Sequence, residues 1–325
     1  MKYFGRRFVQ LSRRPIFLEE KFLFDKDSKE HYIKRGDPNK PTYYIIRRNF
    51  EGEGLFARYR LIMGHVRYAL SKGWIPVVDM QYYPNPYLPP EKLGKENSWE
   101  YYFEQPMRVG LEEAYNGENV ILGRGNFIEP RPGHAMSLLE NKNNSLAEWR
   151  NLIKQGYMKI KPARMKEILA TREKLFAPND RVLGVLLRGT DYVTLRLQGH
   201  PVQPSVELAI STISKKLKEW NCNKIFLATE DKTIVEKIKA AFGDVCITLD
   251  REYVDYEPQP GNRVCVQHLD RENDHFIQGN DYLKQMVLLS MCNSFVGARC
   301  SGTSVVAIMG ENFEHAYFFN LGRYE

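Results

Sequence analysis

The first half of the chain shows two hydrophobic periods in turn, one typical of strands and one typical of a helix. Residues 42–47, "TYYIIR", are β-branched and aromatic and predict a strand. Residues 55–73 place apolar side chains at helical spacing and end at a glycine, which predicts a helix. The runs 74–80 and 119–125 predict two further strands, and residues 145–177 are mostly helical in pattern.

The second half alternates strand and helix patterns more regularly. Strands are predicted at 182–187, 224–230, 245–249, 294–299 and 315–322, and helices at 204–220, 231–243, 280–292 and 301–310. Strands separated by helices of this length are typical of a doubly wound parallel sheet with helices on both faces. We therefore expect an α/β fold.

Length and punctuation predict two lobes. The chain has 325 residues, which is more than one small hydrophobic core usually covers. Pro178, Asn179 and Asp180 interrupt the pattern between the two halves. We expect an N-terminal lobe at 1–178 and a C-terminal lobe at 179–325.

Composition narrows the class of protein and the kind of partner. Hydrophobic residues make up 43% and charged residues 27%, as in globular rather than disordered proteins. The formal net charge of +7 is modest, so it fits an anionic ligand, and we expect no nucleic-acid partner. Five cysteines without a C-x-x-C pair indicate reduced thiols rather than a disulfide framework or a zinc site.

The start of the chain bears on its location. Residues 1–17 are basic but lack a continuous apolar stretch, so we expect no signal peptide. No apolar run is long enough to span a bilayer. We expect a cytoplasmic protein. Peripheral contact between the basic, aromatic start and the inner face of a membrane stays open, with a solvated basic end as the simpler interpretation.

Polar residues lie at or just beyond the carboxyl ends of three of the predicted strands in the second half. They are Arg188, Gly189, Thr190 and Asp191 after the first, Thr229, Glu230 and Asp231 after the second, and Arg299, Ser301, Gly302 and Thr303 after the fourth. Doubly wound sheets bind ligands beyond the carboxyl ends of their strands. An arginine that faces the free N–H groups of a helix start suits a diphosphate. The sequence therefore predicts an anion site at this edge.

Each of these sets also has a simpler structural interpretation. Arg188 beside Asp191 is compatible with a structural ion pair, and the sets at 229–231 and 301–303 are compatible with plain helix caps. His200, just before a helix, is either a donor-site residue or an ordinary loop histidine. His65 lies in a predicted helix and is expected to be packed or solvated rather than catalytic.

Two known nucleotide-binding motifs are absent. No GxxxxGK[ST] occurs, and Gly52-Glu53-Gly54 is followed by residues 55–57, "LFA", instead of the third glycine of a dinucleotide fingerprint. The glycines of this loop either let the backbone approach a ligand in a cleft between the lobes or form a tight turn without one.

The strand-end motifs resemble a known family. The segments 184–204, "GVLLRGTDYVTLRLQGHPVQP", 224–231, "KIFLATED", and 294–310, "SFVGARCSGTSVVAIMG", resemble in order and spacing the C-terminal half of the α1,6-fucosyltransferase superfamily. This group includes core and nodulation-factor fucosyltransferases and is related to α1,2- and protein O-fucosyltransferases. Residues 43–80 are similar to its first lobe. The resemblance implies a GT-B fold, which is two Rossmann-like lobes with a cleft between them.

The resemblance also implies an activity and site roles. It implies an inverting, metal-independent transfer from a nucleotide-diphosphate sugar, which is GDP-fucose in the named families. Arg188 matches the arginine that holds the diphosphate, and Asp191 matches an acid of the donor site. Asp231, with Glu230 beside it, matches the acid after the next strand. Ser301, Gly302 and Thr303 match the phosphate-binding turn.

The sequence departs from the family pattern at several positions. Leu186 and Gly189 stand where the family often has histidine and a second arginine, and Arg196 stands where core-type enzymes carry a catalytic glutamate. The expected base-binding aspartate falls on Met286, with Asp281 nearby. These departures bear on the nucleotide base, the acceptor and the catalytic base.

We predict a glycosyltransferase, with fucosyltransferase as the first choice. It would move a sugar from GDP-fucose to a glycan or lipid-linked oligosaccharide, with inversion and without a metal or other cofactor. Arg188 would stabilise the leaving diphosphate, and Asp191, then Glu230, are the candidates for the base. The alternatives are a GT-B transferase with a different nucleotide sugar, a non-catalytic glycan- or nucleotide-binding homologue, and an α/β protein with structural ion pairs.

An aromatic excursion at 82–106 in the first lobe has two interpretations. Its rings are Tyr82, Tyr83, Tyr87, Trp99, Tyr101, Tyr102 and Phe103. Aromatic side chains stack on sugar rings, which suggests an acceptor site. Packing against the lobe is the favoured interpretation.

Overall fold

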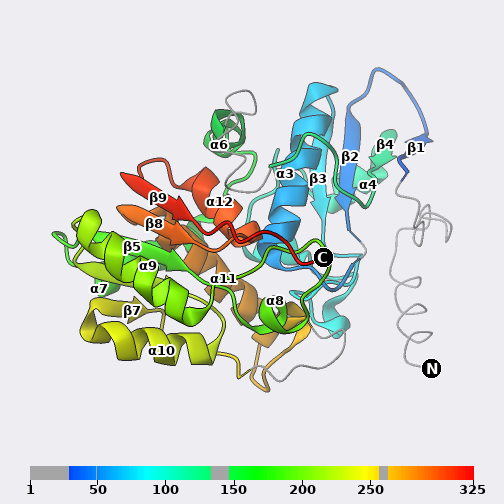
Figure 1. Cartoon of the computed structure of the whole chain (residues 1–325). Helices are drawn as coiled ribbons and strands as arrows, with labels where there is room; N and C mark the ends of the chain where they lie inside the picture. Colours follow the sequence, from blue (N-terminus) through cyan, green and yellow to red (C-terminus); the bar gives the residue numbers. More distant parts are fainter. Residues whose placement is uncertain (1–28, 49, 133–145, 256–262) are drawn as a thin grey trace. The chain divides into compact units, whose positions relative to one another are not determined.

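The chain folds into two α/β units (Figure 1). The computed structural model describes residues 29–48, 50–132, 146–255 and 263–325. Unit 1 comprises Met1–Pro132, Ala147–Arg164 and His268–Asn280, and unit 2 comprises Gly133–Leu146, Met165–Gln267 and Asp281–Glu325. Relative to a single boundary after residue 178, the segment 165–178 belongs to unit 2 and the segment 268–280 to unit 1.

Unit 2 is built on a five-stranded parallel sheet. The strands are β5 (Val182–Leu186), β6 (Lys224–Ala228), β7 (Cys246–Thr248), β8 (Ser294–Gly297) and β9 (His315–Phe318). They lie in the order β7-β6-β5-β8-β9, and every neighbouring pair is parallel. The central strands are buried along nearly their whole length, as expected for strands covered on both faces. The strand predictions for the second half are confirmed.

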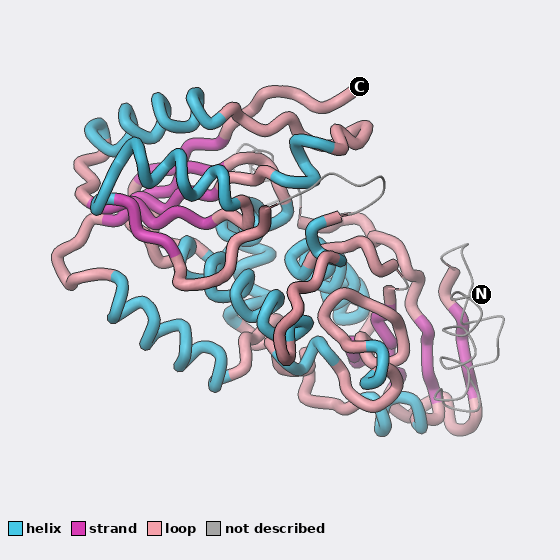
Figure 2. Tube along the Cα trace, turned by 90° about the horizontal axis from the view of Figure 1, so that it is seen from below, coloured by secondary structure: helices cyan, strands magenta, loops and turns pink. Residues whose placement is uncertain are grey.

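Helices cover both faces of this sheet. They are α7 (Pro162–Leu175), α9 (Val206–Glu219), α10 (Lys232–Phe242), α11 (Asp274–Ser290) and α12 (Ser301–Met309), with the short α8 (Thr190–Thr194) and the 3-10 turns η3 (Gly243–Val245) and η4 (Val264–Val266). On one face, Ile213 of α9 and Ile238 of α10 join a buried cluster with Leu183. On the other face, a Cβ at Gly184 would lie 3.1 Å from Leu289 of α11. The sheet is therefore doubly wound, and Figure 2 shows its magenta strands with helices on both sides.

The strand order places a topological switch point between β5 and β8. From β5 the chain continues outward to β6 and β7, whereas from β8 it continues to β9 on the opposite side. Open α/β sheets bind ligands outside the carboxyl ends of the strands at such a point. Arg188 follows β5 and α12 begins shortly after β8, so both lie at the switch point.

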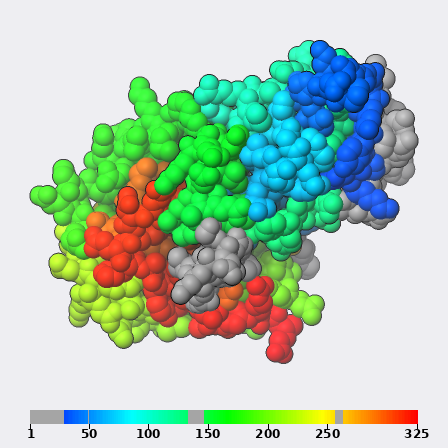
Figure 3. Space-filling model, turned by 90° about the horizontal axis from the view of Figure 1, so that it is seen from above, coloured from blue at the N-terminus to red at the C-terminus, as the bar shows by residue number. Residues whose placement is uncertain are grey.

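Strand β9 forms one edge of the sheet. Its first three residues, His315 to Tyr317, are exposed, and the C-terminal segment that contains them is red at the surface in Figure 3.

Unit 1 has a four-stranded mixed sheet. Its strands are β1 (His31–Lys34), β2 (Thr42–Arg47), β3 (Ile75–Asp79) and β4 (Asn119–Leu122), in the order β1-β4-β2-β3. Strand β2 is parallel to β3 and β4, and β1 is antiparallel to β4. The helices are α3 (Leu55–Ser71), α4 (Leu111–Asn116) and α6 (Leu146–Lys154), with the 3-10 turns η1 (Pro90–Lys92) and η2 (Ser98–Tyr101). The predicted strand, loop, helix and strand are confirmed. The short β1, α4 and α8 were not predicted, because so few residues carry little periodicity.

The aromatic excursion at 82–106 packs inside unit 1. The side chains of Trp99, Tyr102 and Phe103 are fully buried, and those of Tyr83 and Tyr87 are nearly so. The rings of Trp99 and Phe103 stack with 4.3 Å between their centroids. The packed interpretation is therefore confirmed for these five rings.

His65 on α3 is packed, as expected. Its Nδ1 lies 2.9 Å from the Tyr44 hydroxyl, and its Nε2 lies 2.8 Å from the Asn126 carbonyl oxygen. Burial lowers the pKa of His65 to about 4, so the ring is neutral at ordinary pH. It serves as a polar link within the core of unit 1.

Within the described ranges, no helix is both long enough and apolar enough to cross a membrane. The basic segment at 1–17, for which membrane contact was an open question, lies outside the described residues.

Two substitutions on α9 test its placement on the sheet. Ile213 is fully buried, whereas Leu208 is 42% exposed on the same helix. We expect Ile213→Ala to lower the free energy of unfolding by about 2–5 kcal/mol, because it leaves a cavity against β5. The control Leu208→Ala should change it by less than about 0.5 kcal/mol. Urea unfolding of both variants measures the difference, and equal losses would contradict the placement.

Candidate functional site

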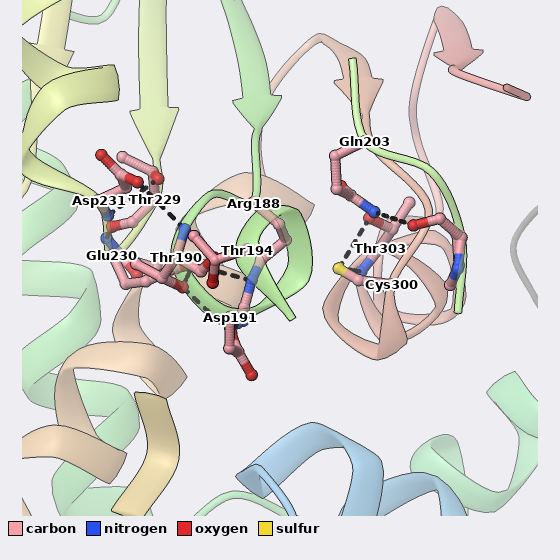
Figure 4. Close-up of polar contacts among 12 residues, drawn as sticks. Arg188, Thr190, Asp191, Thr194, Gln203, Thr229, Glu230, Asp231, Cys300 and Thr303 are labelled. Carbon is pink, nitrogen blue, oxygen red and sulfur yellow. Dashed lines mark hydrogen bonds and ion pairs between the residues drawn. The ribbon is translucent and has the colours of Figure 1, made fainter. Parts of the chain in front are cut away.

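The residues that follow β5 and β6 lie together at the carboxyl edge of the unit 2 sheet (Figure 4). Arg188 Nε lies 3.1 Å from Glu230 Oε1, and the Thr190 N–H donates to Asp231 Oδ2 at 3.1 Å. The start of α12, with Cys300, lies beside them at the same edge in Figure 4. The three strand-end sets predicted from the sequence therefore share one edge of one sheet.

Arg188 is a buried cation held between two carboxylates. Its side chain is 11% exposed, and those of Asp191 and Glu230 are 11% and 13% exposed. One terminal nitrogen of Arg188 lies 3.4 Å from Asp191 Oδ1. The guanidinium carbon lies 4.8 Å from the centroid of the Tyr192 ring, within range of a cation–π interaction. These contacts fix the orientation of the guanidinium.

The guanidinium of Arg188 stays protonated, although the group is buried. Burial acts to lower its pKa, but the acidic groups of Glu230, Tyr282 and Asp191 outweigh burial, so the pKa of Arg188 is raised well above its ordinary value. Arg188 Nε is nonetheless a buried donor without a directed hydrogen-bond acceptor among the described residues. Arg188 Nε is close enough to Glu230 Oε1 to form an ion pair, but the N–H is not directed at this oxygen. Because buried donors are nearly always satisfied, this N–H can bind a ligand anion.

Thr190 connects the two carboxylates. Its Oγ1 lies 2.8 Å from Glu230 Oε1 and 3.1 Å from Asp191 Oδ1. Burial raises the pKa of Glu230, the positive charge of Arg188 acts to lower it, and the negative charge of Asp191 acts to raise it. The net direction is upward, which is typical of a carboxyl group suited to proton transfer.

Asp231 has a structural role in this arrangement. Its Oδ1 accepts the N–H of Ile234 at 3.0 Å, which caps the start of α10. Its Oδ2 accepts the N–H of Thr190, and a Cβ at Gly189 would lie 2.1 Å from this oxygen. The position of Asp231 therefore requires glycine at 189 and joins the loop after β5 to the loop after β6.

The start of α12 is capped by a thiol. Cys300 Sγ accepts the N–H of Thr303 at 3.4 Å, and the Thr303 hydroxyl donates to the Ala298 carbonyl. Thr303 thus has intramolecular partners for both its N–H and its hydroxyl group, and Ser301 and Gly302 precede it in the first turn of α12. Cys300 was not a sequence candidate, because thiols are weak acceptors and seldom counted among helix caps.

Gly302 lets α12 pack closely against α11. A Cβ at this position would lie 2.8 Å from the Tyr282 hydroxyl oxygen and 2.9 Å from Met286 Sδ. A larger residue at 302 would therefore require the side chain of Tyr282 or Met286 to move. Met286 and Asp281 are the two positions considered above for a base-binding aspartate. Met286 is fully buried. Asp281 Oδ2 lies 3.9 Å from Arg251 Nε.

Gln203 is a polar residue of this edge that the sequence did not single out. Its amide nitrogen donates to the carbonyls of Pro201 and Arg299, each at 3.1 Å. Its Oε1 is buried and accepts no hydrogen bond from the described residues. Arg299 donates in turn to Asn320 Oδ1 at 2.6 Å. Gln203 therefore offers an acceptor near the start of α12.

His200 lies against the same group of residues. Its ring centroid is 5.6 Å from that of Tyr192. Burial and then the charge of Arg263 lower the pKa of His200. Two backbone hydrogen bonds to Tyr324 hold this loop in place. The Gly199 N–H donates to the Tyr324 carbonyl at 2.8 Å, and the Tyr324 N–H donates to the His200 carbonyl at 3.0 Å.

The loop Gly52-Glu53-Gly54 lies in unit 1, between β2 and α3. Gly54 is the residue before α3, and Glu53 accepts from Arg48 Nε at 3.2 Å. Arg58 donates from Nε to the Glu53 carbonyl at 3.3 Å. The loop is thus a tight turn fixed by arginines on either side.

The arrangement in unit 2 combines an oriented, permanently charged guanidinium, two nearby carboxyl groups and the start of a helix. Such a set can bind an anion and accept a proton close to it. In the described residues, no group of three or more His, Cys, Asp or Glu side chains is placed to hold a metal ion.

Comparison with known proteins gives similar folds and no sequence match. No protein-family model and no curated protein matches the chain. Among solved structures, the apo form of POFUT1 is similar with a TM-score of 0.51 at 10% sequence identity, over 88% of this chain and 100% of that chain.

Two structures of NodZ are also similar. NodZ alpha-1,6-fucosyltransferase soaked with GDP-fucose has a TM-score of 0.49 at 15% identity, over 86% of this chain and 96% of that chain. Fucosyltransferase NodZ from Bradyrhizobium has a TM-score of 0.48 at 14% identity, over 87% and 96%. The similarity to the apo form of POFUT1 shows that the chain shares the fold of that structure.

The double role of Asp231 predicts a larger loss of stability than a simple cap. We expect Asp231→Ala to lower the free energy of unfolding by more than about 1–2 kcal/mol, because α10 and Thr190 both lose an acceptor. Ser205→Ala, which removes only the cap of α9, is the matched control and should cost about 1 kcal/mol. Urea unfolding measures both, and equal losses would show that the contact with Thr190 contributes nothing.

The raised pKa of Glu230 predicts a pH-dependent stability difference. The folded state keeps a proton that the unfolded state releases, so the contribution of Glu230 is present below its ordinary pKa and is lost as pH rises through the folded pKa. The stability of wild type minus that of Glu230→Gln should therefore fall with pH, by at most about 1.4 kcal/mol per pH unit.

Glu219→Gln is the control of opposite sign for this measurement. A hydrogen bond from Lys216 lowers the pKa of Glu219, so its contribution is lost as pH falls. Urea unfolding at several pH values gives both differences. A flat or rising difference for Glu230 would contradict the raised pKa.

Proposed function

We propose that the chain is a glycosyltransferase that moves a sugar from a nucleotide diphosphate to a hydroxyl group, with GDP-fucose as the first candidate donor. The observation that carries the proposal is Arg188. It is a buried, oriented guanidinium at the switch point of a parallel sheet, and its Nε–H has no directed acceptor in the described part of the chain. The motif resemblance and the fold shared with POFUT1 support this choice of activity.

The donor's diphosphate would bind between Arg188 and the first N–H groups of α12, at Ser301 and Gly302. A guanidinium and a helix start together stabilise the charge that develops on the leaving diphosphate. The remaining residues proposed to line the donor site are Gly189, Thr190, Asp191, His200, Thr229, Asp231, Arg299 and Thr303. Among them, Asp231 and Thr303 would act mainly by holding the loops, because their groups have intramolecular partners.

The proposed reaction is a single displacement with inversion and without a metal. The bond between the anomeric carbon and the diphosphate oxygen breaks, and the electron pair leaves with the nucleotide. The acceptor hydroxyl forms the new bond to that carbon and gives its proton to a carboxylate. Asp191 is the first candidate for this base and Glu230 the second.

The proposal includes a two-lobe arrangement of GT-B type. The C-terminal lobe, 179–325, would bind the donor, and the N-terminal lobe, 1–178, would bind a glycan or lipid-linked oligosaccharide. The loop at Gly52–Gly54 would face the cleft between them. We propose a cytoplasmic location, with the basic start of the chain as the segment for peripheral contact with the inner face of the membrane.

A second candidate function is a transferase of the same fold with another nucleotide sugar. Leu186, which stands at the position of a family histidine, is buried and apolar, so it offers no hydrogen bond to a base. A non-catalytic binding homologue is the third candidate, since Arg196 replaces the family's glutamate. Slow hydrolysis of a bound donor would separate the second candidate from the third.

Nucleotide binding is tested by thermal shift with GDP, UDP, CDP and ADP and with the corresponding sugar donors. We expect GDP to raise the melting temperature, with a stabilisation of about 2.7 kcal/mol at one hundred times Kd. Arg188→Ala should abolish the shift, because it removes the cation for the diphosphate. Arg181→Ala, which removes an exposed arginine paired with Glu314, is the control and should keep it.

Each outcome of this screen changes the proposal in a defined way. A shift with UDP or another nucleotide in place of GDP would replace the donor. A shift that survives in Arg188→Ala would overturn the assigned site, and no shift with any nucleotide would overturn the function.

The catalytic base is tested by activity. Asp191→Asn should lower kcat for transfer or donor hydrolysis by about 10²–10⁴-fold, because the acceptor proton loses its carboxylate. Nucleotide binding should persist in this variant, as measured by the thermal shift. Wild-type kcat in Asp191→Asn, with a large loss in Glu230→Gln, would exchange the two roles.

A further inference from the structure

Thr190 makes two hydroxyl contacts but has only one hydroxyl hydrogen. Its Oγ1 is within hydrogen-bond distance of Glu230 Oε1, at 2.8 Å, and of Asp191 Oδ1, at 3.1 Å. An ionised carboxylate is an acceptor only, so two ionised carboxylates cannot both be satisfied by this hydroxyl. Both contacts are satisfied when one carboxyl group carries a proton and donates it to Thr190 Oγ1.

The charges around Thr190 also indicate that the two carboxyl groups carry one proton between them. The two oxygens that contact Thr190 are the ones that face Arg188, at 3.1 Å for Glu230 Oε1 and 3.4 Å for Asp191 Oδ1. Two ionised carboxylates and one guanidinium would leave a net negative charge in a buried site. One added proton makes the group neutral, and neutral buried groups avoid a large desolvation cost.

The surroundings decide which carboxyl group holds the proton. Burial raises the pKa of Glu230, which favours its neutral form. The other titratable groups that interact with this set are Tyr192 on α8 itself, Tyr282 on α11, Cys300 at the start of α12 and His200 in the loop after α8. His200 has a lowered pKa and adds no positive charge at neutral pH, and Asp231 faces the Thr190 backbone rather than its hydroxyl.

The backbone holds Thr190 in an uncommon conformation to make these contacts. Its φ is +46°, in the left-handed region that β-branched residues rarely adopt. The Thr190 N–H donates to Asp231 Oδ2, and the Thr194 hydroxyl donates to the Thr190 carbonyl at 2.8 Å. The strain is therefore stabilised by specific partners on either side of the residue.

We propose that Thr190 is a positioning residue through which Asp191 and Glu230 share one proton: Glu230 donates to Thr190 Oγ1, which donates to Asp191 Oδ1. This assignment rests on the proposed function only where it makes Asp191 the base. It gives the two candidate bases different roles. Asp191 stays ionised and accepts the proton of the acceptor hydroxyl, while Glu230 stays protonated, so that one carboxylate instead of two balances the charge of Arg188.

The first test needs no nucleotide. Infrared spectroscopy of the ligand-free protein detects the carbonyl stretch of a protonated carboxyl group. The spectrum is recorded at a pH about two units above the ordinary pKa of glutamic acid, where an unperturbed carboxyl group is ionised. In Asp191→Asn, Glu230 is left to balance the charge of Arg188, so we expect no band in that variant. We expect the band in wild type and in Thr190→Ser, which keeps the hydroxyl. It should be lost in Glu230→Gln and lost or shifted in Thr190→Val.

Two infrared results would contradict the proposal. No band in wild type would mean that both carboxyl groups are ionised. A band that stays in Glu230→Gln would place the proton on the wrong residue. If Thr190→Val fails to fold, as judged by circular dichroism, the comparison of wild type with Glu230→Gln and Asp191→Asn still decides.

The second test is the pH profile of kcat/KM. Thr190→Val removes the donor that stabilises ionised Asp191, so the acid limb should move up by about one pH unit. Thr190→Ser should restore the wild-type profile. An unmoved acid limb in Thr190→Val would reject the positioning role. If wild type has no activity with any donor, the proposed function fails, while the infrared band still tests the shared proton on its own.

Discussion

A buried positive charge determines the organisation of unit 2 at its carboxyl edge. Arg188 is enclosed at the end of β5, so it requires negative partners, and both come from within the neighbouring segments: Asp191 from the next turn and Glu230 from the end of β6. Those carboxyl groups in turn bring Thr190 and the loop after β6 into fixed positions. The parallel sheet makes this possible, because it directs the ends of β5, β6 and β8 to one edge.

Much of the fold follows from hydrophobic periodicity. The strands of unit 2 are continuous apolar runs, and α9 and α10 have apolar faces, so pattern alone locates them. The sheet order is then constrained by the preference of strand–helix–strand units for parallel pairing. The short β1, α4 and α8 escape this reasoning, because four to six residues do not define a period.

The site was predictable in its location and less so in its details. Arg188, Asp191 and Glu230 could be chosen because charged residues directly after buried strands need a reason. Three other features could not be predicted: the positive φ of Thr190, the thiol cap by Cys300, and the amide oxygen of Gln203, which accepts no hydrogen bond within the described ranges. Each depends on tertiary contacts that leave no mark in the local sequence. The two contacts of Asp231 were predictable to different degrees. Its cap of α10 was one of the interpretations open from the sequence, whereas its contact with the Thr190 N–H was not predicted.

The pairing of β5 with β8 has a consequence for the order of folding. The Val182 N–H donates to Asn293 Oδ1 across 111 positions of sequence, whereas β5 and β6 are joined by a shorter crossover that contains α8 and α9. Closing the longer loop has the greater entropic cost, so we expect the β5-β6-β7 half of the sheet to form before β8 joins it. The switch point between β5 and β8, where Arg188 meets the start of α12, is then among the last parts of unit 2 to assemble. A partly folded chain would contain Arg188 and its carboxylates while lacking the helix start on the other side.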